Sequence, residues 1–534
     1  MLPFFYAVLT TPLRRAWRLT AIAKTLLGLL GCITLMSSIN GCSTLSTNTT
    51  VTEQNPTNAL LHAKPELVLE RLSWGMTTAS VAQIRKIGVM AFIDQQLKPM
   101  QVTLPKEIQD QLSTMTISQQ SIEQLVTELE QRRLNADAAT NPETARQSYQ
   151  QELNRLAKEA ASRAVLRALY SPQQLQEQLS WFWLNHFSVF QGKNELRAMV
   201  GDYEDNAIRP HLLGRFRDLL GATAIHPAML IYLDNEQNAV KRPNENYARE
   251  IMELHTMGVD GGYSQHDIVE LARILTGFGI NKKLDSAPKY GKLQNQYIRH
   301  GLFEFNPNRH DYGDKQFLGK TIKGRGPAEL DEALDLLARH PATAHFVSKK
   351  LATFFIGDNP PTSIINRMAQ TYLSSDGNIT SVLRTLFAST EFTHSLGTQF
   401  KDPQHYIFSA MRLAYDTQPI LNTGPVLYWL SRLGEPRFGK LTPDGYALTS
   451  SDWNSPGQMT VRFEIANIIA NTNQGLFKSD AGMVKAAFPK LTNALYFDYL
   501  QHTLNPTTLR SLEQATNQQE WNALFLASPE MMLR

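Results

Sequence analysis

The sequence predicts a mainly α protein, with one large multi-helix domain and a small β-ribbon or irregular insertion around residues 286–325. Apolar residues recur at helical spacing over most of the 534 residues, and proline and serine stand at several starts of these stretches. Residues 286–325 break this pattern with glycines and the alternating Phe303 and Phe305. The chain is 42% apolar and 19% charged, an ordinary balance for a globular protein.

Helices are predicted in order along this domain, separated by glycines and polar turns. Residues 118–134 and 142–169 are rich in charge and suggest a solvated hairpin, whereas the aromatic residues 181–187 indicate a buried helix. His226-Pro227 and His340-Pro341 each indicate a helix start, because proline suits the first helical turn. The predicted helices cover about residues 66–74, 81–97, 118–134, 142–169, 173–190, 203–220, 226–234, 244–255, 264–276, 327–339, 342–356, 362–374, 379–389, 402–415, 426–433 and 460–470.

The N-terminal residues have the layout of a bacterial lipoprotein signal. Basic residues precede a Leu-rich run, which ends at Gly41-Cys42. We predict a signal peptide over residues 1–41, a lipidated Cys42, a polar tether over 42–58 and the helical domain over 59–534. Cys32 fits the lipobox pattern better locally, but cleavage there would leave an apolar stretch on the mature chain. A membrane anchor that is never cleaved is the alternative.

This N-terminus predicts an exported protein held in the cell envelope by a lipid anchor. Ser43 after the cysteine favours the outer membrane, facing the periplasm or the cell surface. Cys32 and Cys42 are the only cysteines, so the domain has no disulfide and no thiolate metal site. Four of the 52 basic residues and none of the 49 acidic ones lie in residues 1–41. The remainder is therefore nearly neutral, and we expect no nucleic-acid partner.

The most reactive stretch is residues 244–256, which contain two carboxylates, a guanidinium and amides. On a regular helix Asn246, Arg249, Glu250 and Glu253 share one face, while His255 lies on the opposite, apolar face. We predict Glu250 and Glu253 as catalytic groups, with Asn246 and Arg249 binding substrate.

The next helix is expected to lie beside this stripe, because only a short turn separates them. Ser264 and Asp267 form a capping box, and His266, Glu270 and Arg273 share a face. Carboxylates and imidazoles on adjacent helices can hold a divalent metal, so a metal cofactor is a hypothesis. We predict His266 as catalytic and Arg273 as substrate-binding. The alternative is a structural ion network, in which the arginines neutralise the same carboxylates.

A second candidate lies in the irregular segment, where His310 and Asp311 are adjacent. A His-Asp pair in a loop can supply metal ligands or an oriented base, and we predict both as catalytic. The alternative is a turn in which the aspartates cap backbone groups. The motifs of serine hydrolases, zinc proteases and phosphate-binding loops are absent from the sequence.

Several segments together resemble the bacterial family catalogued as domain of unknown function 1800. They are residues 71–75, 183–187, 226–235, 244–258, 262–267, 272–277, 310–311 and 340–344. Trp74 and Phe278 differ from the aromatic residues common in the family at these positions. The resemblance implies an exported protein without an established reaction. Its members often stand beside genes for secreted proteins that resemble alkaline phosphatases or sulfatases, which makes such a protein a possible partner.

Two functions follow as hypotheses, and the sequence leaves open whether the protein is an enzyme. The first is a metal- or carboxylate-dependent hydrolase or transferase that acts on saccharide or phosphate-ester polymers of the envelope. The second is a non-catalytic assembly or scaffold lipoprotein for an exported partner enzyme.

Overall fold

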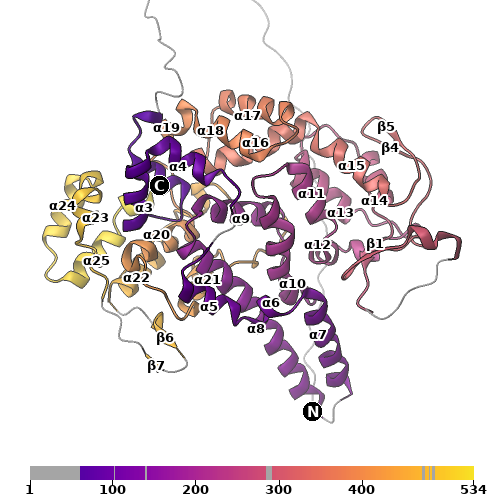
Figure 1. Ribbon diagram of the computed structural model, residues 1–534, viewed down its shortest axis with the longest axis horizontal. Coiled ribbons are helices and arrows are strands. Elements are labelled where there is room, and N and C mark those ends of the chain that lie inside the picture. Colours follow the sequence, from indigo (N-terminus) through magenta and orange to yellow (C-terminus); the bar gives the residue numbers. More distant parts are fainter. Residues whose placement is uncertain are drawn as a thin grey trace, which may run out of the picture. The chain divides into compact units, whose positions relative to one another are not determined.

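Helices make up most of the described chain in the computed structural model (Figure 1). The structure describes residues 60–100, 103–138, 141–283, 291–471, 475–479, 482–483 and 488–534. The predicted signal peptide, the lipidated Cys42, the alternative Cys32 and the tether lie outside these residues. The described residues, from Leu60 onward, form one compact unit. The mainly α fold is confirmed, since the few strands are short and lie in small antiparallel sheets.

The N-terminal half is built from helices that begin mostly at proline, serine, threonine or asparagine. The predicted hairpin is confirmed: α7 and α8 lie side by side (Figure 1), around a small separate core that includes Leu125, Leu129 and Leu153. The helices are α2 (Pro65–Leu72), α3 (Thr78–Ile87), α4 (Val89–Gln96), α5 (Lys106–Ser113), α6 (Thr116–Gln119), α7 (Ile122–Asp137), α8 (Pro142–Tyr170), α9 (Gln174–His186), α10 (Leu196–Asp202), α11 (Phe216–Ala224), α12 (Pro227–Tyr232), α13 (Asn246–Glu250) and α14 (Gln265–Ile274).

Two segments that the sequence assigned to regular helices are π-helical, namely η1 (Tyr203–Ile208) and η4 (Ile251–Thr256). A π-helix closes its hydrogen bonds over five residues rather than four, so side chains beyond it leave the angular positions of an α-helix. Short 3-10 turns occur at η2 (Arg209–His211) and η3 (Asn235–Gln237).

The predicted β insertion is present, but its sheet begins earlier than expected. Strand β1 (Phe278–Ile280) pairs antiparallel with β3 (Phe303–Phe305), which also pairs with β2 (Ile298–His300). A second hairpin joins β4 (Lys315–Phe317) to β5 (Lys320–Ile322), and its turn residues Leu318 and Gly319 both have positive φ, as a tight hairpin turn requires. A further 3-10 turn, η5 (Gly291–Gln296), precedes β2.

The C-terminal half returns to helices and adds one strand pair that the sequence did not predict. These elements are α15 (Ala328–Ala338), α16 (Pro341–Ile356), α17 (Thr362–Ser374), α18 (Ile379–Phe387), α19 (Thr390–Ser395), α20 (Pro403–Tyr415), α21 (Gly424–Arg432), η6 (Ser450–Asp452), α22 (Pro456–Asn471), β6 (Lys478–Ser479), β7 (Gly482–Met483), α23 (Ala494–Asp498), η8 (Leu500–Thr503), α24 (Pro506–Glu513), α25 (Gln518–Leu526) and η9 (Glu530–Met532). Within the described residues, no helix combines the length and apolarity that crossing a membrane requires.

Both predicted His-Pro helix starts are confirmed, and the histidines themselves act as caps. Nδ1 of His226 accepts a hydrogen bond from the Ala228 N–H (3.1 Å), and His340 does the same for Ala342 (3.2 Å). These bonds satisfy backbone donors that a helix start leaves without an intrahelical partner.

Candidate functional site

The helix that carries the predicted stripe is not regular. Residues Asn246–Glu250 form α13, and the chain then continues as the π-helical η4. The assumption of 100° per residue therefore holds only for the first part of the stripe. Glu250 is the last α-helical residue, so the two predicted carboxylates lie on either side of the junction.

Arg249 binds carboxylates of its own helix. Its Nη2 and Nη1 lie 3.3 Å from Glu245 and 3.3 Å from Glu253, respectively, and Nη2 also donates to the side chain of Gln265 (3.0 Å). Asn246 donates to the backbone oxygen of Leu233 (3.2 Å), which ties α13 to the end of α12. The guanidinium is thus already shared between two carboxylates.

Glu250 differs from Glu253, because its half-buried carboxyl has no hydrogen bond or ion pair among the described residues. Burial raises its pKa, and the negative charges of Glu253 and Asp444 add to this effect. The carboxyl also lies within electrostatic range of the buried Tyr232, whose phenol pKa is raised by burial first and by Glu250 second. Among the described residues, Glu250 is therefore the one predicted catalytic carboxyl that makes no ion pair.

The predicted partners on α14 are directed elsewhere. His266 is exposed and makes no hydrogen bond within the part of the chain that the structure describes. Arg273 donates to Glu270 (2.8 Å) and, through two nitrogens, to Asp311 (2.8 and 3.2 Å). The pKa of Arg273 is raised, mainly by the bond to Asp311, and Arg273 helps to hold the pKa of Asp311 below its ordinary value, against the opposing effect of burial. This pairing joins α14 to the segment before β4.

His310 is enclosed in a separate buried network. Its Nδ1 lies 2.7 Å from the backbone oxygen of Thr276. Its Nε2 lies 3.0 Å from the carboxyl of Glu329, which also pairs with Lys315. The side chains of His310, Lys315 and Glu329 have no solvent exposure. Burial alone would raise the pKa of Glu329, but the hydrogen bonds from its two neighbours outweigh it and lower the pKa.

The eight predicted site residues therefore fall into separate groups. Arg249 pairs with Glu253, and Arg273 pairs with Asp311. The buried His310 pairs with Glu329. The remaining three predicted residues belong to none of these pairs: Asn246, Glu250 and His266. Among the described residues, no group of three or more histidine, cysteine, aspartate or glutamate side chains is arranged to hold a metal ion.

Sequence reasoning missed Lys350, which lies on α16. The side chain is half-buried, lacks a hydrogen bond or ion pair in the described residues, and its Nζ lies 5.6 Å from the centre of the Phe346 ring. Burial lowers its pKa to about 8, although the charge of Asp444 opposes this shift. The signal for it was present in the sequence, since Lys350 stands four residues from both Phe346 and Phe354 on a largely apolar helix.

Two buried histidines, His186 and His255, lie within electrostatic range of Lys350. His186 Nε2 donates to the backbone oxygen of His255 (3.0 Å), and the two rings lie 6.2 Å apart. Burial lowers the pKa of His255 to about 3, with a smaller effect from the charge of Lys350, and it lowers the pKa of His186 as well. Both imidazoles are therefore neutral. The expectation that His255 faces the apolar side is confirmed by its 1% exposure.

Asp444 is positioned by a tight junction between the end of α9 and the loop that contains Tyr446. Asn185 and Tyr446 exchange reciprocal hydrogen bonds of 2.9 and 2.6 Å. Gly445 lies between them with φ 76°, where a Cβ would collide with the backbone oxygen of Asn185. This contact brings Asp444 within electrostatic range of both Glu250 and Lys350.

The comparison with known families is decisive for residues 67–533. They match the family model described as "Protein of unknown function (DUF1800)". The chain belongs to the DUF1800 family. No curated protein and no solved structure matches it. The predicted family is thus confirmed over nearly the whole chain, and the family description gives no activity.

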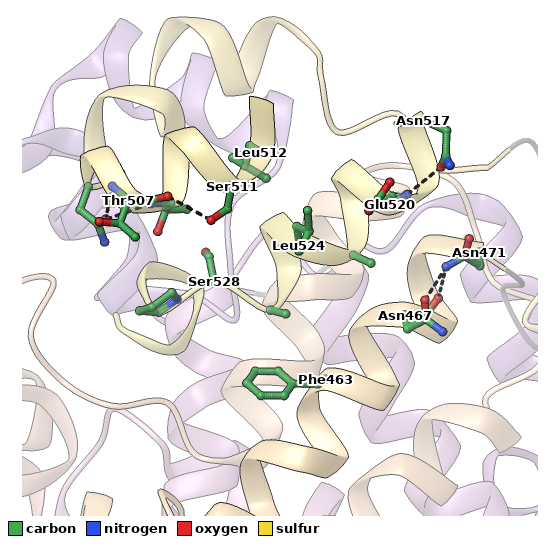
Figure 2. Close-up of a pocket in the computed structure, with 15 residues that line it drawn as sticks. Phe463, Asn467, Asn471, Thr507, Ser511, Leu512, Asn517, Glu520, Leu524 and Ser528 are labelled. Carbon is green, nitrogen blue, oxygen red and sulfur yellow. Dashed lines mark hydrogen bonds between the residues drawn. The ribbon is translucent and has the colours of Figure 1, made fainter. Parts of the chain in front are cut away.

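A large cavity of this DUF1800 chain lies away from the predicted residues, between α22, α24 and α25 (Figure 2). Its volume is about 730 Å³, and its lining includes Phe463 and the amides of Asn467 and Asn471. Ser528 also lines it, with a buried hydroxyl that has no hydrogen-bond partner among the described residues. Within the part of the chain that the structure describes, no lysine, arginine or predicted site residue lines this cavity.

Proposed function

We propose that this chain is an exported envelope lipoprotein that cleaves or transfers a bond in an envelope polymer by acid–base catalysis at Glu250 and Lys350. One observation carries the proposal: both side chains are half-buried, neither makes a hydrogen bond or an ion pair among the described residues, and both lie within electrostatic range of Asp444. Unpaired, partly buried ionisable groups are unfavourable for folding, and they cluster at functional sites.

The chemistry follows from the two environments. Glu250, with a raised pKa, keeps its proton to higher pH than an ordinary glutamate and donates it to the oxygen of the leaving group. The exposed carboxyl of Asp444, which accepts a hydrogen bond from Thr442 (2.5 Å) and lies 3.6 Å from Lys440, accepts a proton from the attacking water. Lys350 binds an anionic group of the substrate while it is charged, and it acts as a base above a pH of about 8. A saccharide or a phosphate ester suits this set.

The other predicted site residues have no role in this proposal, because their side chains already bind one another or face solvent. The divalent metal remains a hypothesis and is tested by adding a chelator. The lipid anchor at Cys42, outer-membrane attachment and work beside a secreted phosphatase- or sulfatase-like protein belong to the same proposal.

The test uses the full chain with separate fractions of envelope polysaccharide and phosphate-ester polymer. Release of reducing ends or phosphate is expected from the wild type and from Glu107→Gln, which changes an exposed glutamate on α5. Glu250→Gln is expected to lower the rate by about 100-fold or more, since it removes a general acid. An unchanged rate in a folded Glu250→Gln protein, or no release by the wild type from either polymer, rejects the enzyme.

The scaffold function is the second candidate, and the pairing of Arg249, Arg273 and Glu329 favours it. Under this alternative, the partner enzyme is captured equally by the wild type and Glu250→Gln. Pull-down of a secreted phosphatase-like protein by both chains, without product release, would support it.

A further inference from the structure

A second cavity, of about 460 Å³, lies between α8, the loop that follows α9, α21 and the loop after α21. Its charged lining residues are Lys158, Arg197 and Arg437, and no aspartate or glutamate lines it. A volume of this size lies in the range of small-molecule sites. The charged side chains that line this cavity are therefore all basic.

Arg437 is the most unusual of these cations. Its side chain is only 4% exposed, and its Nε and Nη1 atoms have no hydrogen-bond partner among the described residues. The guanidinium carbon lies 5.1 Å from the centre of the Trp181 ring, and burial lowers the pKa of the group. A buried guanidinium without a carboxylate partner destabilises the folded state unless an anionic ligand binds it.

The carboxylates whose charge reaches Arg437 already bind other groups, and one of them, Glu435, accepts a hydrogen bond from the backbone N–H of Gln404 (3.0 Å). Glu177 accepts two bonds of 2.8 Å from Arg209, and Asp205 pairs with Arg163 (3.1 Å) and Arg167. Glu204, whose charge also reaches Arg437, accepts from Ser180 (3.0 Å) and lies 3.7 Å from Arg209. No carboxylate within ion-pair distance of Arg437 occurs in the described residues.

Arg197 is oriented but not neutralised. Its Nη1 and Nη2 donate to the amides of Asn154 and Gln150, both at 2.6 Å, while its buried Nε has no hydrogen-bond partner among the described residues. Lys158 is exposed and makes no ion pair in the part of the chain that the structure describes. Two amides thus hold a guanidinium in place without cancelling its charge.

We propose that this cavity binds a phosphate monoester. Its dianionic group would bind Arg437, Arg197 and Lys158, because guanidinium groups match phosphate oxygens with paired hydrogen bonds. Phe190 and Leu427 line the same cavity and would contact the organic part of the ester. The proposal does not depend on acid–base catalysis at Glu250, since the two sites share no residue.

The experiment is calorimetric titration of the full chain at low ionic strength with inorganic phosphate, glycerol 3-phosphate and glycerol. Glycerol 3-phosphate is expected to bind more tightly than inorganic phosphate, and glycerol is expected not to bind. Vesicles with and without phosphatidic acid distinguish a lipid headgroup from a soluble ester. Selective sedimentation with phosphatidic acid assigns the lipid source, and binding of glycerol 3-phosphate alone assigns the soluble source.

Two substitutions at exposed or partly exposed side chains test the site with little effect on folding. Arg197→Gln and Lys158→Gln are each expected to weaken glycerol 3-phosphate binding about 10-fold, as loss of a charge-assisted contact does. Lys349→Gln removes an exposed lysine on α16 and should bind as the wild type does. Binding that both cavity variants leave unchanged, or no binding of any phosphate probe by the wild type, overturns the site. Equal affinity for inorganic phosphate and glycerol 3-phosphate overturns the ester.

Discussion

Two regions of the molecule contain similar ionisable side chains but use them differently. Around β4, the groups of Arg273, Asp311, Lys315 and Glu329 each have a partner of opposite charge. Around the end of α13, Glu250 and Lys350 have none among the described residues. Pairing makes the first region a structural link between α14, the strands and α15. The absence of pairing makes the second the better candidate for chemistry, although the sequence motifs pointed to both.

The largest effect on stability is expected from a substitution at Glu329. Glu329→Gln leaves Lys315 buried beside a neutral amide, so it should lower the free energy of unfolding by about 3–5 kcal/mol. Glu332→Gln on the same helix removes only an exposed pair with Arg325 and should cost less than about 1 kcal/mol. Urea denaturation of both variants measures the difference. Equal losses would show that the buried network is not structural.

The next expected effect is the titration of Lys350. Competitive acylation followed by mass spectrometry should give a labelling midpoint near pH 8 in the folded chain. The same lysine in urea should show a midpoint of about 10.4, the value of a solvated lysine. Identical profiles in the two states would remove Lys350 from the proposed site.

The smallest effect is expected at Glu250. Because the pKa of Glu250 is raised in the folded chain, the folded chain binds more protons than the unfolded chain near this pKa. As the pH rises from about 4.5 through the folded pKa, the wild type should therefore lose stability relative to Glu250→Gln. At pH 4 the two proteins should differ by less than about 0.5 kcal/mol. Melting curves of both proteins from pH 4 to 7 test the sign. A wild type that gains stability over this range would mean that the carboxylate has a cation partner.

Much of the fold could be predicted, because local rules decide it. The capping box of Ser264 and Asp267, the α7–α8 hairpin and the His-Pro starts all depend on residues close in sequence. The π-helical turn at Ile251–Thr256 and the pairing of Phe278 with Phe305 could not be read this way. A π-turn has no periodicity signal of its own, and strand pairing across a long loop depends on tertiary contacts.

The site was less predictable for a related reason. The geometry of a regular helix places Arg249 on one face with Glu250 and Glu253, but in the structure Arg249 pairs only with Glu253 of these two. Which charge stays unpaired depends on neighbours far away in sequence, such as Asp444, which is held near α13 by the junction of Asn185 with Tyr446. The spacing of Lys350 from Phe346 and Phe354 can be read from the sequence, but the burial that lowers its pKa depends on tertiary packing.

The histidine cap at His340 makes the start of α16 conditional on acidity. An imidazole accepts the N–H of Ala228 or Ala342 only while its Nδ1 carries no proton. Burial lowers the pKa of His340, which keeps that cap neutral in mildly acidic surroundings. In strong acid, the His340 ring would instead present a second donor and a positive charge to the positive end of α16. An asparagine at position 340 would retain the cap at any pH, so protonation of His340 is expected to weaken the start of α16 in acid.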